Sequence, residues 1–170
     1  MHLYGREIRC KQEASISGVR IIKLTMHTDY ALRVLLQAAS APGTRLSIAQ
    51  VAAQHGISRN HLMKVVNQLA NIGLIETVRG PGGGFSLARD PAGITLGEVV
   101  RQTEPNMQAA DCGACMFRAG CGLTPILGSA MDAFLDVLDR RTLADALKDS
   151  ALDFAHPAPA TLATAAAETS

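Results

Sequence analysis

The stretch ISRNHLMKVVNQLANIGLIETVRGPGGGFSLA, at residues 57–88, carries the pattern that decides the fold. Its first half predicts a helix over residues 59–72, because apolar residues recur at helical spacing and a glycine follows. The predicted buried stripe of this helix is Leu62, Val65, Val66 and Leu69. Its second half contains two short strand-like runs, 74–79 and 85–87, around a glycine-rich turn, which predicts a β-hairpin.

A shorter helix precedes this one. Residues 47–55 open with Ser47-Ile-Ala-Gln50, the sequence of a capping box, and Gly56 is the predicted stop. Two helices joined by a short glycine-containing turn form the helix-turn-helix pattern, and a hairpin directly after the pair is a wing. The sequence therefore predicts a mainly α fold with a winged helix-turn-helix DNA-binding domain over residues 23–103.

Further helices are predicted on both sides of this pair. One covers residues 28–39, with Thr28 as its cap. Downstream, Thr95-Leu-Gly-Glu98 is a second capping-box sequence, and residues 124–139 form a long helix with apolar residues on one side. Thr142 is expected to cap a last short helix.

The net charge of +1 over 170 residues hides a segregation of charge along the chain. Residues 1–43 and 44–90 each carry a net charge of +3, whereas residues 91–154 carry −4. A basic half followed by an acidic stretch is typical of an anion-binding domain joined to a separate module. Chance clustering of charge on solvated faces is the alternative.

Both ends of the chain lack helical or strand periodicity. Residues 1–22 are expected to be a disordered or spurious extension, in which Cys10 has no assigned role, and residues 155–170 a disordered tail. The N-terminal residues lack the apolar segment of a signal peptide, and no run of 18 apolar residues occurs. The expected location is therefore cytoplasmic, where thiols stay reduced, with no membrane partner.

The start of the second helix of such a pair meets base edges in the major groove of double-stranded DNA. Arg pairs bidentately with guanine and Asn with adenine, and a serine at a helix N-terminus can hold a phosphate. The candidate DNA-binding residues are Ser58, Arg59, Asn60, His61 and Lys64 on the helix, and Arg79, Gly82 and Gly83 on the wing. A packing or capping role is the alternative for His61, and a protein module with ordinary surface charge is the alternative for the whole domain.

Three cysteines, Cys112, Cys115 and Cys121, lie within ten residues of one another. In a reducing cell this density favours soft-metal ligation over disulfides. A structural zinc site normally needs a fourth protein ligand, which is not nearby in sequence, so an iron–sulfur cluster fits better. Incidental or redox-active thiols are the alternative, and the spacing does not distinguish 2Fe–2S from 4Fe–4S. No catalytic triad, phosphate loop or paired carboxylates emerge, so an enzyme is not expected.

Together these segments resemble the small winged-helix regulators of the Rrf-two family, over residues 23–150. The segments that carry the resemblance are 24–36, 57–88, 94–105, the cysteine loop and 142–147. The resemblance implies a transcriptional regulator that acts as a homodimer on an inverted-repeat operator. It also implies a cluster-binding sensor loop at 104–123 and dimerisation helices at 124–154.

Within the family the sequence is most similar to the nitric-oxide-sensing repressors. In them an acid in the first helix supplies the fourth ligand across the dimer, and Asp29 occupies that position. A helix-start residue favoured by the helix dipole is the alternative for Asp29. The branch that regulates cluster supply uses a histidine three residues after the last cysteine, where this chain has Thr124. A regulator of iron–sulfur homeostasis and a thiol- or zinc-dependent redox regulator are the alternative functions.

Overall fold

The structure is a computed structural model that describes residues 23–80, 82–107, 115–117 and 120–150. The expected terminal extension and tail, together with Cys10 and Cys112, lie outside the described residues. The described elements, in chain order, are α1 (Met26–Ser40), α2 (Ile48–His55), α3 (Arg59–Asn71), β1 (Ile75–Val78), β2 (Gly84–Leu87), the 3-10 helix η1 (Pro91–Gly93), α4 (Leu96–Thr103), α5 (Leu123–Asp139) and α6 (Leu143–Lys148). This mainly helical fold with one hairpin confirms the predicted fold class.

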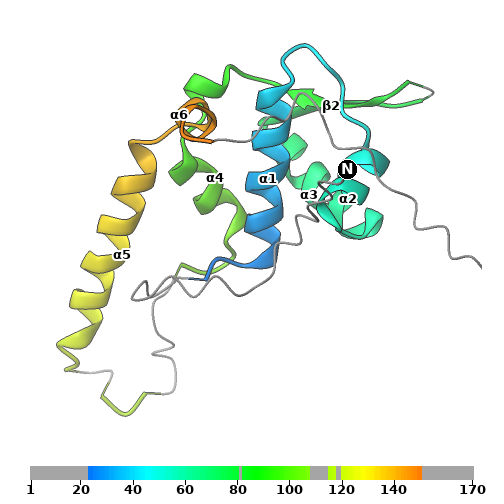
Figure 1. The fold of residues 1–170 in the computed structure, drawn as a ribbon. Helices are drawn as coiled ribbons and strands as arrows, with labels where there is room; N and C mark the ends of the chain where they lie inside the picture. The colour runs from blue at the N-terminus through cyan, green and yellow to red at the C-terminus, as the bar shows by residue number, and fades with distance from the viewer. Residues whose placement is uncertain (1–22, 81, 108–114, 118–119, 151–170) are drawn as a thin grey trace, which may run out of the picture.

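Helix α1 is the centre of the winged domain (Figure 1). It contacts α3, α4, α6 and β2, so most of the core is built around its buried face. The predicted stripe on α3 is fully buried, with every member at most 1% exposed. The largest buried side chains include Phe85, Leu35, Leu62, Leu69, Leu74, Ile94 and Leu143. These come from the helices, the hairpin and the short segments between them, which explains why the elements pack as one unit.

The wing is a two-stranded antiparallel hairpin in which Ile75 pairs with Leu87 and Val78 with Gly84. Leu46 extends it, because its N–H and C=O both bond to Phe85, at 2.8 and 2.9 Å. The segment between α1 and α2 thus adds a strand-like bridge that the sequence pattern did not predict. This bridge fastens the buried base of the hairpin to the helices.

Two predictions at helix N-termini are wrong: the start of α1 and the capping box of α2. Helix α1 begins earlier than residue 28, because Thr25 is its cap and accepts a hydrogen bond from the N–H of Thr28, which is itself buried. Ser47 occupies the N-cap of α2 but its side chain makes no capping bond, so the predicted capping box does not form. The first turn of α2 closes instead through the backbone bond from Val51 N–H to the Ser47 carbonyl.

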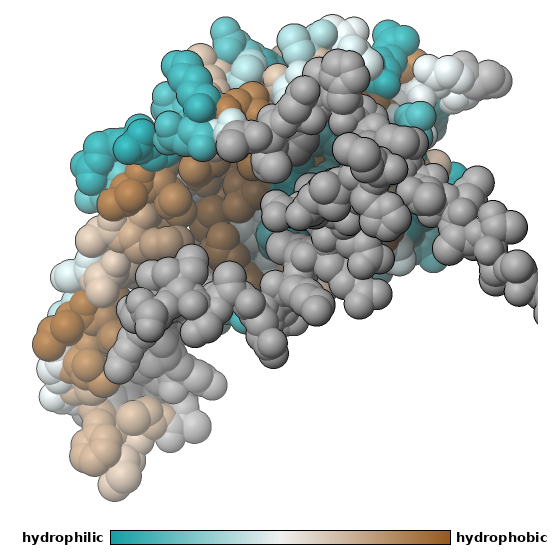
Figure 2. Space-filling view, in the orientation of Figure 1, coloured by the Kyte–Doolittle hydropathy of each residue, from teal (hydrophilic) through white to brown (hydrophobic). Residues whose placement is uncertain are grey.

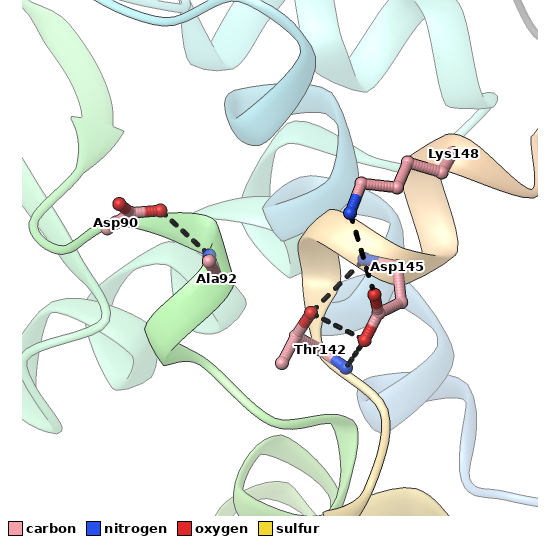
Figure 3. A network of polar contacts seen from close by, with 5 residues as sticks. All are labelled: Asp90, Ala92, Thr142, Asp145 and Lys148. Carbon is pink, nitrogen blue, oxygen red and sulfur yellow. Dashed lines mark hydrogen bonds and ion pairs between the residues drawn. The ribbon is translucent and has the colours of Figure 1, made fainter.

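The two downstream caps differ from each other. Thr95 accepts from Glu98 N–H, but the Glu98 carboxylate pairs with Arg89, so only half of that box is present. Thr142 and Asp145 form the complete reciprocal box at the start of α6 (Figure 3). Backbone and side-chain hydrogen bonds from Thr142 lower the pKa of the Asp145 carboxyl.

Helix α5 projects from the winged domain as an arm (Figure 1). None of its residues is buried, although the predicted apolar residues lie along it. Leu123, Ile126 and Val137 are 56%, 66% and 56% exposed. Figure 2 shows hydrophobic surface along the same arm. Such a contiguous apolar surface on a single chain is typical of a protein interface.

No helix in the described part of the chain is long and apolar enough to cross a membrane.

Candidate nucleic-acid interface and cysteine loop

Helix α3 begins at a capped, exposed corner of the domain. Ser58 has extended backbone angles, and its hydroxyl accepts a hydrogen bond from His61 N–H at 3.3 Å. One free donor of the helix start is thereby satisfied, and the positive end of the helix dipole points outward at Ser58. This placement suits an anionic partner such as a DNA phosphate.

The two faces of α3 have different chemistry. The apolar stripe is buried, whereas Arg59, Asn60 and Lys64 are all exposed, as the predicted recognition face requires. Met63 and Asn67 are exposed too, and helical spacing extends the polar face through Asn67. Asn67 was not among the predicted DNA-binding residues, although its spacing from Asn60 was a sufficient signal.

His61 is half-buried rather than fully displayed. Its ring meets Tyr30 edge-on with ring centroids 5.1 Å apart, and lies 6.3 Å from the ring of His27. The side chain therefore packs α3 against α1. The packing role, which was the alternative for His61, therefore accounts for the position of this side chain.

Arg79 follows β1 and is exposed at the turn of the wing. Gly82 is exposed with a positive φ of 74°, a conformation that favours glycine. Gly83 has a different reason to be glycine, because a Cβ there would overlap the backbone oxygen of Val78. The tight turn is thus a structural reason for glycine at this position, and contact of Gly83 with DNA stays a prediction.

Arg45 is a basic residue beside the wing that was not among the predicted DNA-binding residues. It is exposed, and a Cβ added to Gly84 would lie 3.6 Å from the Arg45 Cβ. The Leu46 bridge to β2 is what brings it there. No pattern in the sequence predicted that bridge, because it is a single pairing outside the hairpin.

Helices α1 and α2 are joined by a polar contact. The side-chain Oε1 of Gln37 lies 2.8 Å from His55 Nε2, and Gln37 Nε2 donates to Gln54 Oε1 at 2.6 Å. Burial lowers the pKa of His55, and the positive charge of Arg33 lowers it further. A neutral His55 ring is thus favoured at this joint, which fits a packing role.

Two of the three clustered cysteines are described. Cys115 is exposed, and Cys121 is half-buried just before α5, whose N-cap is Gly122. Hydrogen bonds from the backbone N–H of Leu123 and Thr124 lower the pKa of the Cys121 thiol. Amide donors at a helix start stabilise the thiolate, which is the form that binds metals.

Asp29 lies in the first turn of α1, as predicted. Its carboxylate is paired with Arg33 one turn later, at 2.7 Å. Among the described residues of a single chain, no three His, Cys, Asp or Glu side chains come together. Asp29 and the described cysteines therefore do not form a site within one subunit.

The capped helix with its exposed Arg, Asn and Lys side chains, set beside a hairpin wing, defines a winged helix-turn-helix protein of the class that regulates transcription by binding DNA. The chain belongs to the Rrf2 family, whose model, described as an iron-dependent transcriptional regulator, matches residues 24–149. Members of this family are regulators and not enzymes, as the sequence predicted.

Curated relatives and solved structures agree with this placement. The chain is 46% identical over 134 residues to the HTH-type transcriptional regulator NsrR of Bacillus subtilis, covering 75% of this chain and 92% of the relative. It is 45% identical to NsrR of Geobacillus kaustophilus, covering 76% and 92%. The predicted similarity to the nitric-oxide-sensing repressors is in line with these names.

The fold is also similar to that of two solved regulators. CymR, the global cysteine regulator of B. subtilis, has a TM-score of 0.63 at 27% identity, covering 76% of this chain and 99% of that one. IscR of T. potens has a TM-score of 0.63 at 28% identity, covering 75% and 88%. Proteins of one fold thus carry different regulatory names, so the fold alone does not identify the signal.

Proposed function

We propose that this protein is a homodimeric repressor. Its affinity for an inverted-repeat operator depends on an iron–sulfur cluster that senses nitric oxide. The observation that carries the proposal is the pairing of an exposed recognition face on α3 with a thiolate-stabilising site at Cys121. Similarity to regulators named NsrR supports the choice of signal.

Helix α3 and the wing bind the DNA in this proposal. Arg59 and Asn60 read base edges, Ser58 and the helix start hold a phosphate, and Lys64 lies one turn further along the groove. Arg79 contacts the backbone or the minor groove from the wing. Two copies of this face on one dimer would meet major grooves about one helical turn apart.

Helix α5 forms the contact between the two subunits in this proposal. No residue of α5 is buried within its own chain, and Leu123, Ile126 and Val137 are exposed. Covering this surface with the same helix of a second subunit would remove it from water. Because Cys121 directly precedes α5, the sensor loop would then lie next to the dimer contact.

The residues available as ligands support an iron–sulfur cluster as the cofactor. Cys112, Cys115 and Cys121 would hold the cluster as thiolates, and Asp29 of the second subunit would be the fourth ligand after giving up its pairing with Arg33. The cluster would supply iron that reacts with nitric oxide. What the protein contributes is a stabilised thiolate at Cys121, and loss of ligation would free the loop and the start of α5. That change would alter the spacing of the two recognition helices and release the DNA.

The test is an absorption spectrum of anaerobically purified protein with and without nitric oxide, combined with an operator titration. Wild type and Cys10→Ala are expected to be brown, to lose operator affinity with nitric oxide, and to bind less tightly as salt rises. Cys112→Ala is expected to be colourless and unresponsive. A Cys112→Ala protein that still binds operator and still responds to nitric oxide would contradict the proposal.

A thiol- or zinc-dependent regulator is the second candidate, and the lowered pKa of Cys121 favours it because a thiolate also reacts directly with oxidants. A colourless wild-type protein with bound zinc, or one whose response follows a disulfide, would select this candidate. A brown protein that responds to iron supply and not to nitric oxide would select the iron–sulfur homeostasis role.

A further inference from the structure

Gln68, in the second half of α3, contacts two other elements with the two ends of its side-chain amide. Its Nε2 donates to the backbone carbonyl of Gln102 at 2.7 Å, and its Oε1 lies 2.5 Å from His27 Nε2. His27 is in the first turn of α1, and Gln102 is in the last turn of α4. One side chain thus joins the recognition helix to both.

The chemistry of the partners allows only one orientation of this amide. A backbone carbonyl can only accept, so the NH2 group of Gln68 must face Gln102. The Gln68 oxygen is then left for His27, which must donate through Nε2–H. The carbonyls in the last turn of a helix have no partner within the helix, so the bond to Gln102 satisfies a group that α4 leaves open.

A second contact closes the same region. The carboxylate of Glu104 accepts from Thr25 N–H at 2.7 Å, while the Glu104 N–H bonds to the Val100 carbonyl. Thr25 is the cap of α1, and Glu104 follows α4 directly. We call Thr25, His27, Gln68, Gln102 and Glu104 the loop-start cluster, because residue 104 is where the predicted cysteine loop begins.

The loop-start cluster gives the loop a direct mechanical link to the DNA-binding face. Residues 102–104 cannot shift relative to α3 without breaking the Gln68 bonds or taking α3 with them. Lys64 lies one turn from Gln68 on the same helix, so a tilt at Gln68 is transmitted to the recognition face. His61 is seven residues before Gln68, on the same side of α3, and packs on the same part of α1.

We propose that Gln68 is a positioning residue that couples the start of the cysteine loop to the DNA-recognition helix. It contacts neither sulfur nor DNA and acts through Gln102 and His27. This inference rests on the proposed function, because it assumes that the state of the loop controls operator binding. In energetic terms, the proposal is a coupling free energy between the cysteine loop and the DNA-recognition face. The Gln68 contacts would carry this coupling by differing between two states of the loop.

The test compares operator affinity of the cluster-loaded and cluster-free forms of each variant, on an inverted-repeat duplex selected with the wild-type protein. Gln68→Met keeps the length of the side chain and removes both hydrogen bonds. Gln68→Glu keeps an acceptor for His27 but sets a carboxylate against the Gln102 carbonyl. Gln54→Met is the matched control, because it removes a glutamine–glutamine bond between α1 and α2 that does not reach the loop.

Both Gln68 variants are expected to reduce the ratio of loaded to cluster-free affinity by about two- to tenfold, the factor given by loss of an ordinary hydrogen bond. A purely structural defect would weaken both forms equally and leave the ratio unchanged. Hydrogen exchange of the α3 amides, compared between cluster-free and loaded protein, is a second readout and is expected to lose its dependence on loading in Gln68→Met.

A ratio unchanged in both Gln68 variants, or reduced equally in Gln54→Met, would overturn the role of Gln68 while leaving the proposed function intact. A wild-type protein whose loaded and cluster-free forms bind operator equally would instead contradict the proposed function, and with it this inference.

Discussion

The guanidinium of Arg101 makes two parallel hydrogen bonds with the carboxylate of Asp139, at 2.5 and 2.6 Å. They join the exposed side of α4 to the last residue of α5, and they lower the pKa of the Asp139 carboxyl. The Asp139 side chain lies directly over Gly97, where a Cβ would overlap it. A backbone hydrogen bond from Leu96 N–H to the Arg141 carbonyl, at 2.8 Å, reinforces this attachment. The arm is thus held at its C-terminal end.

Substituting Gly97 by alanine is expected to destabilise the protein, although alanine is the better helix former. Propensity alone would favour Gly97→Ala by about 1 kcal/mol. The added methyl group must displace Asp139 and the end of α5, however, and overpacking costs about 1–3 kcal/mol. We expect a lower midpoint in urea unfolding.

Gly93→Ala is the matched control, since a Cβ at Gly93 meets nothing within 4 Å. Its effect is expected to stay within about 0.5 kcal/mol. A Gly97→Ala protein more stable than the wild type would show that α5 does not pack closely on α4.

Acid is expected to destabilise the fold through His55. Its pKa in the folded protein is lowered by burial, so the folded state binds fewer protons than the unfolded state near the ordinary value of 6.5. This contribution to stability is complete above about pH 6.5 and is lost as the pH falls through the lowered value. Urea midpoints measured across this window should fall toward acid.

The matched variant is His55→Gln, which can still bond to Gln37 but does not titrate. Its urea midpoint should fall less than that of the wild type between about pH 7.5 and about pH 5.5. Equal falls in the two proteins would show that other groups account for the acid sensitivity. Asp139 and Asp145 weaken the fold only at lower pH, near and below their ordinary carboxyl value of 3.8.

Neighbouring residues on the recognition helix should differ sharply in their effect on stability. Leu62 is 0% exposed and Met63 is 45% exposed. Leu62→Ala is expected to lower the free energy of unfolding by about 2–5 kcal/mol, because it leaves a cavity in the core. Met63→Ala should change it by about 0.5 kcal/mol or less. Similar losses in the two variants, measured by urea unfolding, would contradict the orientation of α3.

The recognition face makes separate predictions for specificity and for affinity. Arg59→Ala should cost about 1–3 kcal/mol on the best operator and relax the preference at one base pair. Lys64→Ala should weaken binding on all sequences and reduce the salt slope by about one. Binding titrations over a salt series, with operator and scrambled duplexes, measure both effects.

Lys148→Ala is the charge control for these titrations, because Lys148 is a 77% exposed lysine on α6, an element separate from the recognition helix. It should leave both affinity and salt slope unchanged. If Lys148→Ala matched Lys64→Ala, binding would depend on net charge rather than on the face of α3.

Local patterns in the sequence predicted the winged domain well. The stripe from Leu62 to Leu69, the stop at Gly56 and the box at Thr142 depend on spacing and on residue type, so they could be read directly. The cap of α1 was predicted at the wrong residue, and Ser47 lies at the predicted N-cap of α2 but makes no capping bond, because capping depends on backbone geometry. Thr25 and Thr28 have equivalent chemistry, and only the start of the helix shows which of them caps it.

Long-range contacts could not be predicted in the same way. The hydrogen bonds of Gln68 to His27 and Gln102 join residues that are 41 and 34 positions apart in the sequence. A glutamine side chain has no local preference from which such distant partners could be predicted. The Leu46 bridge and the bonds of Asp139 to Arg101 are of the same kind. Each results from how the helices pack and not from any local spacing.

The sequence by itself determined the class of domain, because hydrophobic periodicity is a local property. It also predicted the recognition face and the cysteine loop, from residue types at local spacing. The tertiary structure alone decided which polar side chains meet. It left Leu123, Ile126 and Val137 of α5 exposed and paired Asp29 with Arg33. It also placed Gln68 between the recognition helix and the start of the cysteine loop. The physical reason is that a hydrogen bond or ion pair requires two groups within about 3 Å, and only packing of the core brings distant parts of the chain that close.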